Sequence, residues 1–349
     1  MVNRELSAGE CNWLAVRKYL REHRHELTAA AGAEYPLVPR VAGTPLLTRP
    51  EWLPQAPIEL QDVQLAFRPD LDGAARVLPD GYPSYARAMQ ALAPPAIFED
   101  RVTYRLLDAD LARTPGTMAF GCGRYFDGIN VGEAAAHEFA AGRLSRGVGS
   151  GLREVVADPR DLRRRGVNLA ISTLTVRLNR RTGHATFLLH WRDPALVGHA
   201  GGMYQVVPVG VFQPSDEAAW STDFSLWYSI VREYAEELAG HDEMRGPGGR
   251  FAHQMTAARD AGQIRAWCLG LGVDPLSYAA DLLAVVVIDE EVFTDLFADN
   301  LTGNAEGRVL APRAFTEAVV AQTVDGDPLQ AAGAAVLRLA WTHHATLLR

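Results

Sequence analysis

Apolar residues between positions 227 and 238 recur at the spacing of one face of a helix. The resulting stripe consists of Trp227, Ile230, Val231, Tyr234 and Leu238. Glu233, Glu236 and Glu237 fall on the opposite flank of this predicted helix, three and four residues apart. The pattern therefore predicts an amphipathic helix with an apolar side for packing and an acidic side.

Three glutamates at this spacing repel one another, by roughly 0.2–0.5 kcal/mol per pair. A divalent cation would turn this repulsion into attraction, and hard carboxylate oxygens suit Mg²⁺ or Mn²⁺. Glutamate is also a strong helix former, so the same residues are compatible with a solvated helix face that binds no metal. Both hypotheses remain open at this point.

Strand patterns surround the acidic helix in the sequence. The continuous apolar run Leu282–Ile288 predicts a strand that is buried on both faces, and Ile264–Val273 predicts a neighbouring strand. Leu169–Leu178 and His184–Arg192 predict a hairpin whose turn contains a glycine. Met203–Phe212 predicts a further strand, which contains a Pro-x-Gly sequence.

Residues 1–94 predict an N-terminal helix followed by an extended arm. Ser7 and Glu10 have the spacing of a capping box, and the helix is expected to continue to about Ala31. Its basic residues are interpreted as a solvated polar face, or alternatively as a contact for nucleic acid or a phosphate-rich ligand. The proline- and glycine-rich stretch 36–95 indicates an arm that wraps a core, with a short helix near Tyr85–Leu92.

The region after the arm combines short strands, a helix and a basic loop. Val102–Leu107 and Thr117–Phe120 predict strands, and Asn130 is the expected N-cap of a helix that ends near Ala141. Within that helix, Glu133 and His137 are four residues apart and are expected to form an ordinary helix contact. Arg163–Arg165 is interpreted as a solvated loop, or alternatively as a contact for substrate phosphate.

The composition indicates a globular protein that needs no disulfide bonds and has no membrane-spanning segment. The 349 residues are 48% hydrophobic and 22% charged, and the net charge of −8 argues mildly against nucleic acid as a partner. Cys11, Cys122 and Cys268 lack metal-ligand spacing and are expected to be free thiols. No signal peptide is recognised, and the longest apolar run is too short to span a bilayer. We therefore expect a cytoplasmic protein without a membrane partner.

The chain is expected to fold as an α+β protein in four regions. These are an N-terminal helix and arm at 1–94, an accessory αβ region at 95–160, the main domain at 161–300 and a C-terminal helical tail at 301–349. The tail is predicted to be one long helix that starts at Asp327. Its apolar residues, together with the long arm, suggest a homodimer.

The order of these elements resembles the Nudix superfamily. A hairpin, a strand into Pro208-x-Gly210 and a helix with Arg-Glu-x-x-Glu-Glu are similar to the signature of that family, R-E-U-x-E-E, where U is a bulky apolar residue. Arg232–Glu237 matches this signature. The resemblance implies a Nudix-like α/β/α sandwich with a mixed sheet over residues 161–300.

By this resemblance, the acidic helix is a catalytic helix. Glu236 and Glu237 would hold Mg²⁺ or Mn²⁺, and Glu233 would bind metal too and orient the attacking water or accept its proton. Arg232 would position the carboxylates, and the Gly210 carbonyl would join the metal shell. Further predicted substrate contacts are Arg192, Gly210 and Phe212.

The sequence departs from the family signature in the loop before the helix. A glutamate is expected eight residues before Arg232, where this chain has Phe224, and a glycine is expected where it has Ala218. Gly210 and Glu217 would fill these two roles if the loop carried an insertion of roughly seven residues. The helix half of the motif is therefore kept and the loop half is altered.

Two functional hypotheses follow from the resemblance. The first is a metal-dependent hydrolase that cleaves a phosphoanhydride in a nucleoside-diphosphate-linked or related phosphorylated small molecule. The alternative is a catalytically weak or inactive Nudix-like sensor for a nucleotide-like ligand. Stretches such as Tyr104–Leu107 and Tyr204–Pro214 are similar to actinobacterial Nudix-like proteins that are often described as transcriptional regulators. Specificity would lie in loops 193–202, 213–222 and 241–256.

Overall fold

The protein is described here from a computed structural model. The described residues are 5–68, 84–95, 98–144, 151–192, 202–240, 249–297 and 307–349. Within them the chain forms helices at both ends and mixed sheets between, which confirms the predicted α+β class. None of the helices in these ranges has the length and apolarity that crossing a bilayer requires.

The largest sheet in the described part of the chain is mixed and has the order β1-β10-β11-β5-β6-β13, with β9 paired to β5. Its central strand β11 runs parallel to β5 and antiparallel to β10. Every residue of β11 except the last is buried, as the continuous apolar run predicted. The bounds are β1 Ile58–Glu59, β5 Leu169–Leu178, β6 Ala185–Phe187, β9 Val209–Val211, β10 Ile264–Val273, β11 Ala280–Asp289 and β13 Arg313–Ala314.

Two smaller sheets flank the large one. One has the order β12-β7-β8 and the other β2-β4-β3. The predicted strands 184–192 and 203–212 each divide, so that β6 and β9 join the large sheet while β7 and β8 join a small one. The bounds are β2 Gln64–Phe67, β3 Val102–Asp110, β4 Thr117–Arg124, β7 Leu189–Arg192, β8 Tyr204–Val206 and β12 Gly307–Val309.

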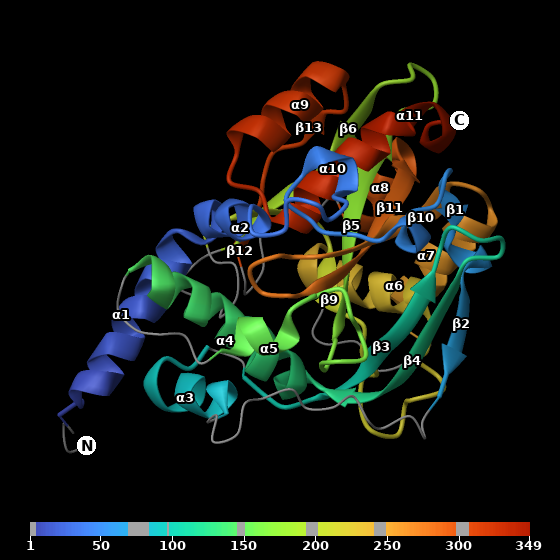
Figure 1. Ribbon diagram of the computed structural model, residues 1–349. Helices are drawn as coiled ribbons and strands as arrows, with labels where there is room; N and C mark the ends of the chain where they lie inside the picture. The colour runs from blue at the N-terminus through green and yellow to red at the C-terminus, as the bar shows by residue number, and fades with distance from the viewer. Residues whose placement is uncertain are drawn as a thin grey trace.

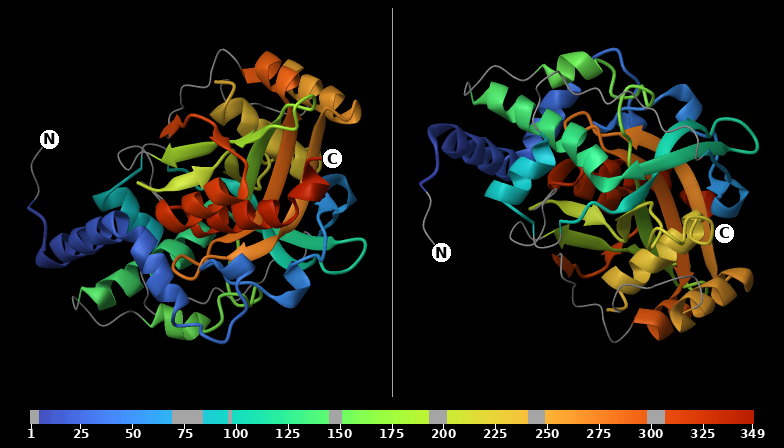
Figure 2. Two further views of the ribbon diagram at one scale, coloured as in Figure 1. Left: turned by 90° about the horizontal axis from the view of Figure 1, so that it is seen from above. Right: turned by 90° about the horizontal axis from the view of Figure 1, so that it is seen from below.

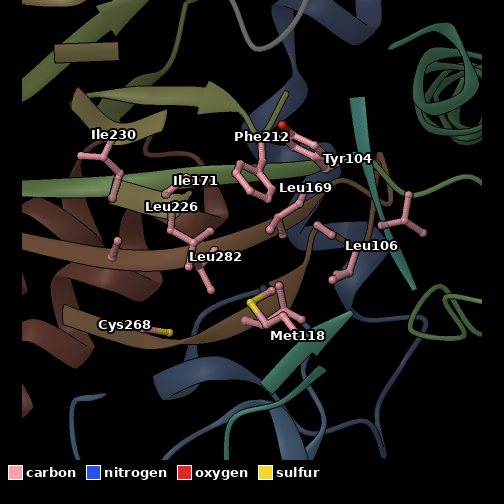
Figure 3. Packing of buried hydrophobic residues seen from close by; sticks show 14 of the residues in the cluster. Tyr104, Leu106, Met118, Leu169, Ile171, Phe212, Leu226, Ile230, Cys268 and Leu282 are labelled. Atoms are coloured by element: carbon pink, nitrogen blue, oxygen red, sulfur yellow. The ribbon is translucent and has the colours of Figure 1, made fainter. Parts of the chain in front are cut away.

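Helices cover both faces of the large sheet (Figures 1 and 2). On one face, α10 packs on β5 and β11, and on the other α6 and α7 pack on β9 and β10. Figure 3 shows the core on the α6 side, where side chains of β3, β5, β11 and α6 meet. The bounds are α6 Leu226–Glu237, α7 Arg250–Asp260, α8 Glu290–Phe297, α9 Glu317–Gly326, α10 Ala331–Thr342 and α11 His344–Leu347.

The N-terminal helical region consists of two helices, α1 Ala8–Glu22 and α2 Arg24–Gly32. The predicted capping box is present, because the Glu10 N–H donates to Ser7 Oγ at 3.2 Å and the Ser7 N–H donates to Glu10 Oε2 at 2.8 Å. The expected single helix is interrupted at His23, whose backbone is not helical.

A buried ion cluster fixes α1 and α2 against α4 (Tyr125–Arg143). Glu133 of α4 is 2% exposed, and its carboxylate pairs with Arg17 of α1 and with Arg24 of α2, the latter at 2.6 Å. His137 contacts the hydroxyl of Tyr85 at 2.9 Å. The expectation of a solvated basic face is therefore wrong for Arg17 and Arg24, which meet Glu133 inside the protein, whereas Lys18 and Arg21 are exposed as expected.

Other helix boundaries also differ from the prediction. Asn130 lies inside α4, and its side-chain oxygen accepts hydrogen bonds from Ala86 N–H and Ser84 Oγ at the start of α3. It therefore caps a neighbouring helix. Asp327 follows α9, and α10 begins after Gln330. The remaining helices are α3 Tyr85–Leu92, α5 Leu152–Val156, η1 Val41–Gly43, η2 Pro50–Trp52 and η3 Leu60–Asp62.

Candidate functional site

Helix α6 carries the predicted site, and its ends are defined by two local signals. Ser225 is the N-cap, and its hydroxyl accepts the Tyr228 N–H at 3.3 Å. Asp223, two residues before this N-cap, accepts the Ser215 N–H at 2.7 Å. After the helix, Gly240 has a φ of +65°, a backbone conformation that glycine adopts without strain.

The apolar side of α6 is anchored to the large sheet as predicted. Ile230, Val231 and Tyr234 are buried. The hydroxyl groups of Tyr234 and Thr175 on β5 lie 2.7 Å apart, and Thr175 donates to the Val207 carbonyl at 2.6 Å. Burial raises the pKa of Tyr234, so its hydroxyl remains protonated. These contacts hold α6 at a fixed position beside the turn that leads into β9.

Two of the three glutamates face β9. The Val209 N–H donates to Glu237 Oε1 at 2.9 Å. A Cβ atom at Gly210 would lie only 1.9 Å from Glu233 Cδ, so the Glu233 carboxylate rests directly on the backbone of this glycine. The expectation that all three glutamates share one outer flank is corrected: the side chain of Glu237 is 8% exposed, whereas that of Glu236 is 32% exposed.

Arg232 links the segment that follows β9 to two of the carboxylates, and its side chain is 4% exposed. Its Nη1 donates to the Gln213 carbonyl at 2.9 Å, and its Nη2 donates to Glu233 Oε1 at 3.3 Å. Its Nε lies 3.9 Å from Glu236 Oε1. A guanidinium held in this way offsets the repulsion between neighbouring carboxylates and limits their rotation.

A histidine that sequence reasoning missed completes the surroundings of Glu237. His190 on β7 is 1% exposed, and its Nδ1 lies 3.9 Å from Glu237 Oε2. Side chains alternate along a strand, so Arg192 points to the same side of β7 as His190. No local pattern in 184–192 indicated this pairing, because the partner of the histidine is distant in sequence.

Phe212 belongs to the core and not to an accessible surface. It is fully buried, and its ring packs on Tyr104 at 4.5 Å and on Phe224 at 5.7 Å between ring centroids. Figure 3 shows Phe212 and Tyr104 side by side. We therefore leave Phe212 out of the site as built from the structure. Phe224, at the position where the family has a glutamate, is part of the same aromatic cluster.

The remaining candidates lie apart from the carboxylates or have structural partners. Arg165 is 3% exposed and its Nη2 donates to the Pro159 carbonyl at 2.7 Å, so it supports a loop. Arg163 pairs with Asp161 at 3.1 Å. Glu217 is 76% exposed and lies 3.6 Å from an arginine of β4. Of the expected specificity loops, residues 193–201 and 241–248 lie outside the described residues.

Comparison with known proteins adds no family assignment. No protein-family model matches the sequence, and no curated protein matches it. The functional argument therefore rests on the geometry around α6.

That geometry is compatible with a metal ion that is held partly by the protein and partly by water and substrate. It is not compatible with a site in which side chains supply all the ligands. In the described part of the chain, no group of three or more His, Cys, Asp or Glu side chains is arranged to hold a metal ion. Glu233 and Glu237 instead form a pair of carboxylates one helical turn apart beside β9. Mg²⁺ is commonly held by one or two carboxylates together with water and substrate phosphates. The two residues fit that mode of binding.

Proposed function

We propose that this chain is a Nudix-like hydrolase that cleaves a phosphoanhydride in a nucleotide-like, phosphorylated small molecule. One observation carries the proposal: Glu233 and Glu237 are positioned one helical turn apart against the backbone of Val209 and Gly210. This arrangement joins the part of the sequence that resembles the Nudix signature to the Pro208-x-Gly210 turn. A Mg²⁺ or Mn²⁺ ion bound there would offset phosphate charge and activate water.

Each residue of the site would have a separate role in binding or catalysis. Glu237, fixed by the Val209 N–H, would hold the metal together with Glu233. Arg232 would orient the neighbouring carboxylates and offset their charge, because its guanidinium reaches both Glu233 and Glu236. Glu236 is the most exposed of the three glutamates and would accept a proton from water or complete the metal shell.

Arg192 would bind the phosphates. It shares a side of β7 with His190, whose ring lies next to Glu237. A guanidinium at this place supplies planar donors that match phosphate oxygens.

A second candidate function is a sensor that binds the same class of ligand without efficient turnover. The observation that favours it is Phe224, which replaces the loop glutamate and packs in an aromatic cluster with Phe212 and Tyr104. With this carboxylate missing, ligand binding would be retained while catalysis is weakened.

The test is hydrolysis of a panel of ADP-ribose, dinucleotides, nucleoside triphosphates and nucleotide sugars with Mg²⁺ or Mn²⁺. The wild type is compared with Glu233→Gln and Glu237→Gln, and with the control Glu26→Gln, whose side chain is 78% exposed on α2. Turnover that is lost in the two site variants and kept in the control supports the hydrolase.

Metal-dependent thermal stabilisation by one compound without turnover supports the sensor. Turnover that persists unchanged in both site variants contradicts the assignment of these carboxylates. The absence of both turnover and stabilisation across the panel contradicts the proposed ligand class.

A further inference from the structure

We infer that His190 is a positioning residue that orients the carboxylate of Glu237 for metal and phosphate binding. The inference rests on the proposed hydrolase function. His190 lies outside the Nudix-like signature, on strand β7, which belongs to a different sheet from β9. It would therefore be a further residue that supports the carboxylates of α6.

The first support is the way in which Glu237 is enclosed. Its Oε1 accepts the Val209 N–H from β9 at 2.9 Å, and its Oε2 lies 3.9 Å from His190 Nδ1 on β7. The two carboxylate oxygens therefore have contacts on two different strands. The hydrogen bond fixes Oε1, and the buried imidazole beside Oε2 limits the directions in which the carboxylate can turn about its terminal bond.

The second support is the rigidity of the strand that carries the histidine. β7 is the central strand of its sheet, and His190 is paired with Gln205 of β8 on one side and with Val309 of β12 on the other. Gln205 is itself tied to Gln330 before α10 by a hydrogen bond of 2.9 Å. The backbone of His190 is therefore held in place on both sides. A side chain can orient a neighbouring group only when its own backbone is fixed in this way.

The third support is burial. The side chains of His190 and Glu237 are 1% and 8% exposed, so water does not compete strongly for their interaction. Electrostatic interactions are stronger in such surroundings than in water. Groups that orient a metal-binding side chain typically contribute 10–100-fold to metal affinity or activity. We expect an effect of this size here.

The experiment compares His190→Leu, His190→Gln and the wild type by steady-state kinetics over a range of Mg²⁺ concentrations. His190→Leu should lower kcat about 10–100-fold and raise the Mg²⁺ concentration for half-maximal activity, with a smaller change in the substrate KM. His190→Gln retains an N–H donor and should recover most of the lost activity. His25→Leu is the control, because this exposed histidine makes its hydrogen bond with the Leu329 carbonyl and not with a carboxylate of α6.

A second measurement does not depend on turnover. Mn²⁺ binding by calorimetry should be about 10–100-fold weaker in His190→Leu than in the wild type, and close to the wild type in His190→Gln. Thermal unfolding of each variant shows whether it is folded at the assay temperature. Should His190→Leu fail to fold, the comparison of His190→Gln with His190→Asn, which has a shorter reach, takes its place.

The outcomes separate this inference from the proposed function. A wild type that hydrolyses the panel, together with a folded His190→Leu whose kcat and metal dependence are unchanged, overturns the positioning role and leaves the hydrolase intact. A wild type without turnover that binds Mn²⁺ in a His190-dependent way rejects the hydrolase and keeps the positioning role. A wild type with neither turnover nor Mn²⁺ binding rejects both.

Discussion

The substitution Asp281→Asn is expected to stabilise the protein at alkaline pH. Asp281 lies on the central strand β11, is 7% exposed, and accepts a hydrogen bond of 2.8 Å from Ser172 Oγ on β5. Burial raises the pKa of Asp281 from its ordinary value of 3.8 to about 7, although the hydrogen bond from Ser172 acts in the opposite direction. The folded protein therefore favours the protonated carboxyl group.

The sign and size of the effect follow from this pKa. The unfolded chain releases the proton near pH 3.8 and the folded protein only near pH 7, so the free energy of unfolding falls as the pH rises between these values. Each pKa unit corresponds to about 1.4 kcal/mol, and the loss therefore approaches about 4 kcal/mol above pH 8. Below about pH 4 the carboxyl group is mostly protonated in both states and the loss nearly disappears. Asparagine keeps the shape of the neutral carboxyl group and cannot ionise.

Urea unfolding of the wild type and Asp281→Asn at pH 4, 6 and 8 measures this difference. The advantage of the variant should increase by several kcal/mol between pH 4 and pH 8, whatever constant offset the amide introduces. Asp62→Asn, which alters an exposed aspartate of η3, should show no such increase. An advantage that is the same at all three pH values would show that the buried carboxyl group does not titrate differently in the folded protein, and would refute the reasoning.

Two further substitutions test the N-terminal ion cluster and the carboxylate site. Glu133→Gln leaves the buried Arg17 and Arg24 without a compensating charge. The substitution should therefore lower the free energy of unfolding, measured by urea titration, by about 3–5 kcal/mol. A loss below about 1 kcal/mol contradicts the ion cluster. Gly210→Ala places a methyl group on the Glu233 carboxylate and should lower hydrolase activity at least about 10-fold, while the variant stays folded by circular dichroism. Unchanged activity in the folded variant would show that Glu233 does not need its observed position.

Local patterns predicted much of the secondary structure. The apolar run 282–288 and the stretch 264–273 became β11 and β10, and the stripe from Trp227 to Leu238 became the buried side of α6. The short helix Tyr85–Leu92 was placed with its observed bounds. In each case the spacing of apolar residues within a single element contains the information, because one face of that element is buried.

The errors arose where distant segments decide the outcome. Glu133 was expected to make an ordinary contact within its own helix, and the pattern of that helix does not indicate its pairing with two arginines more than 100 positions earlier. The segment 203–212 reads as one strand, yet β8 and β9 pair with different sheets. Likewise, helical spacing groups Glu236 with Glu237, and only the position of β9 separates them. His190 was overlooked for the same reason.

The helix residues that resemble the Nudix signature favour catalysis, whereas the absence of the loop glutamate argues against it. The packing of the core explains why this glutamate is absent. Phe224 packs against Tyr104, Phe120 and Phe212, with ring centroids 4.9–5.7 Å apart, so a glutamate at this position would place a charge among aromatic rings. The exposed Glu217 does not replace it near α6, since it pairs with β4. Under the proposed function, the carboxylates that the structure places beside β9 and that would activate water are therefore the glutamates of α6, and substitutions in that helix decide between the hydrolase and the sensor.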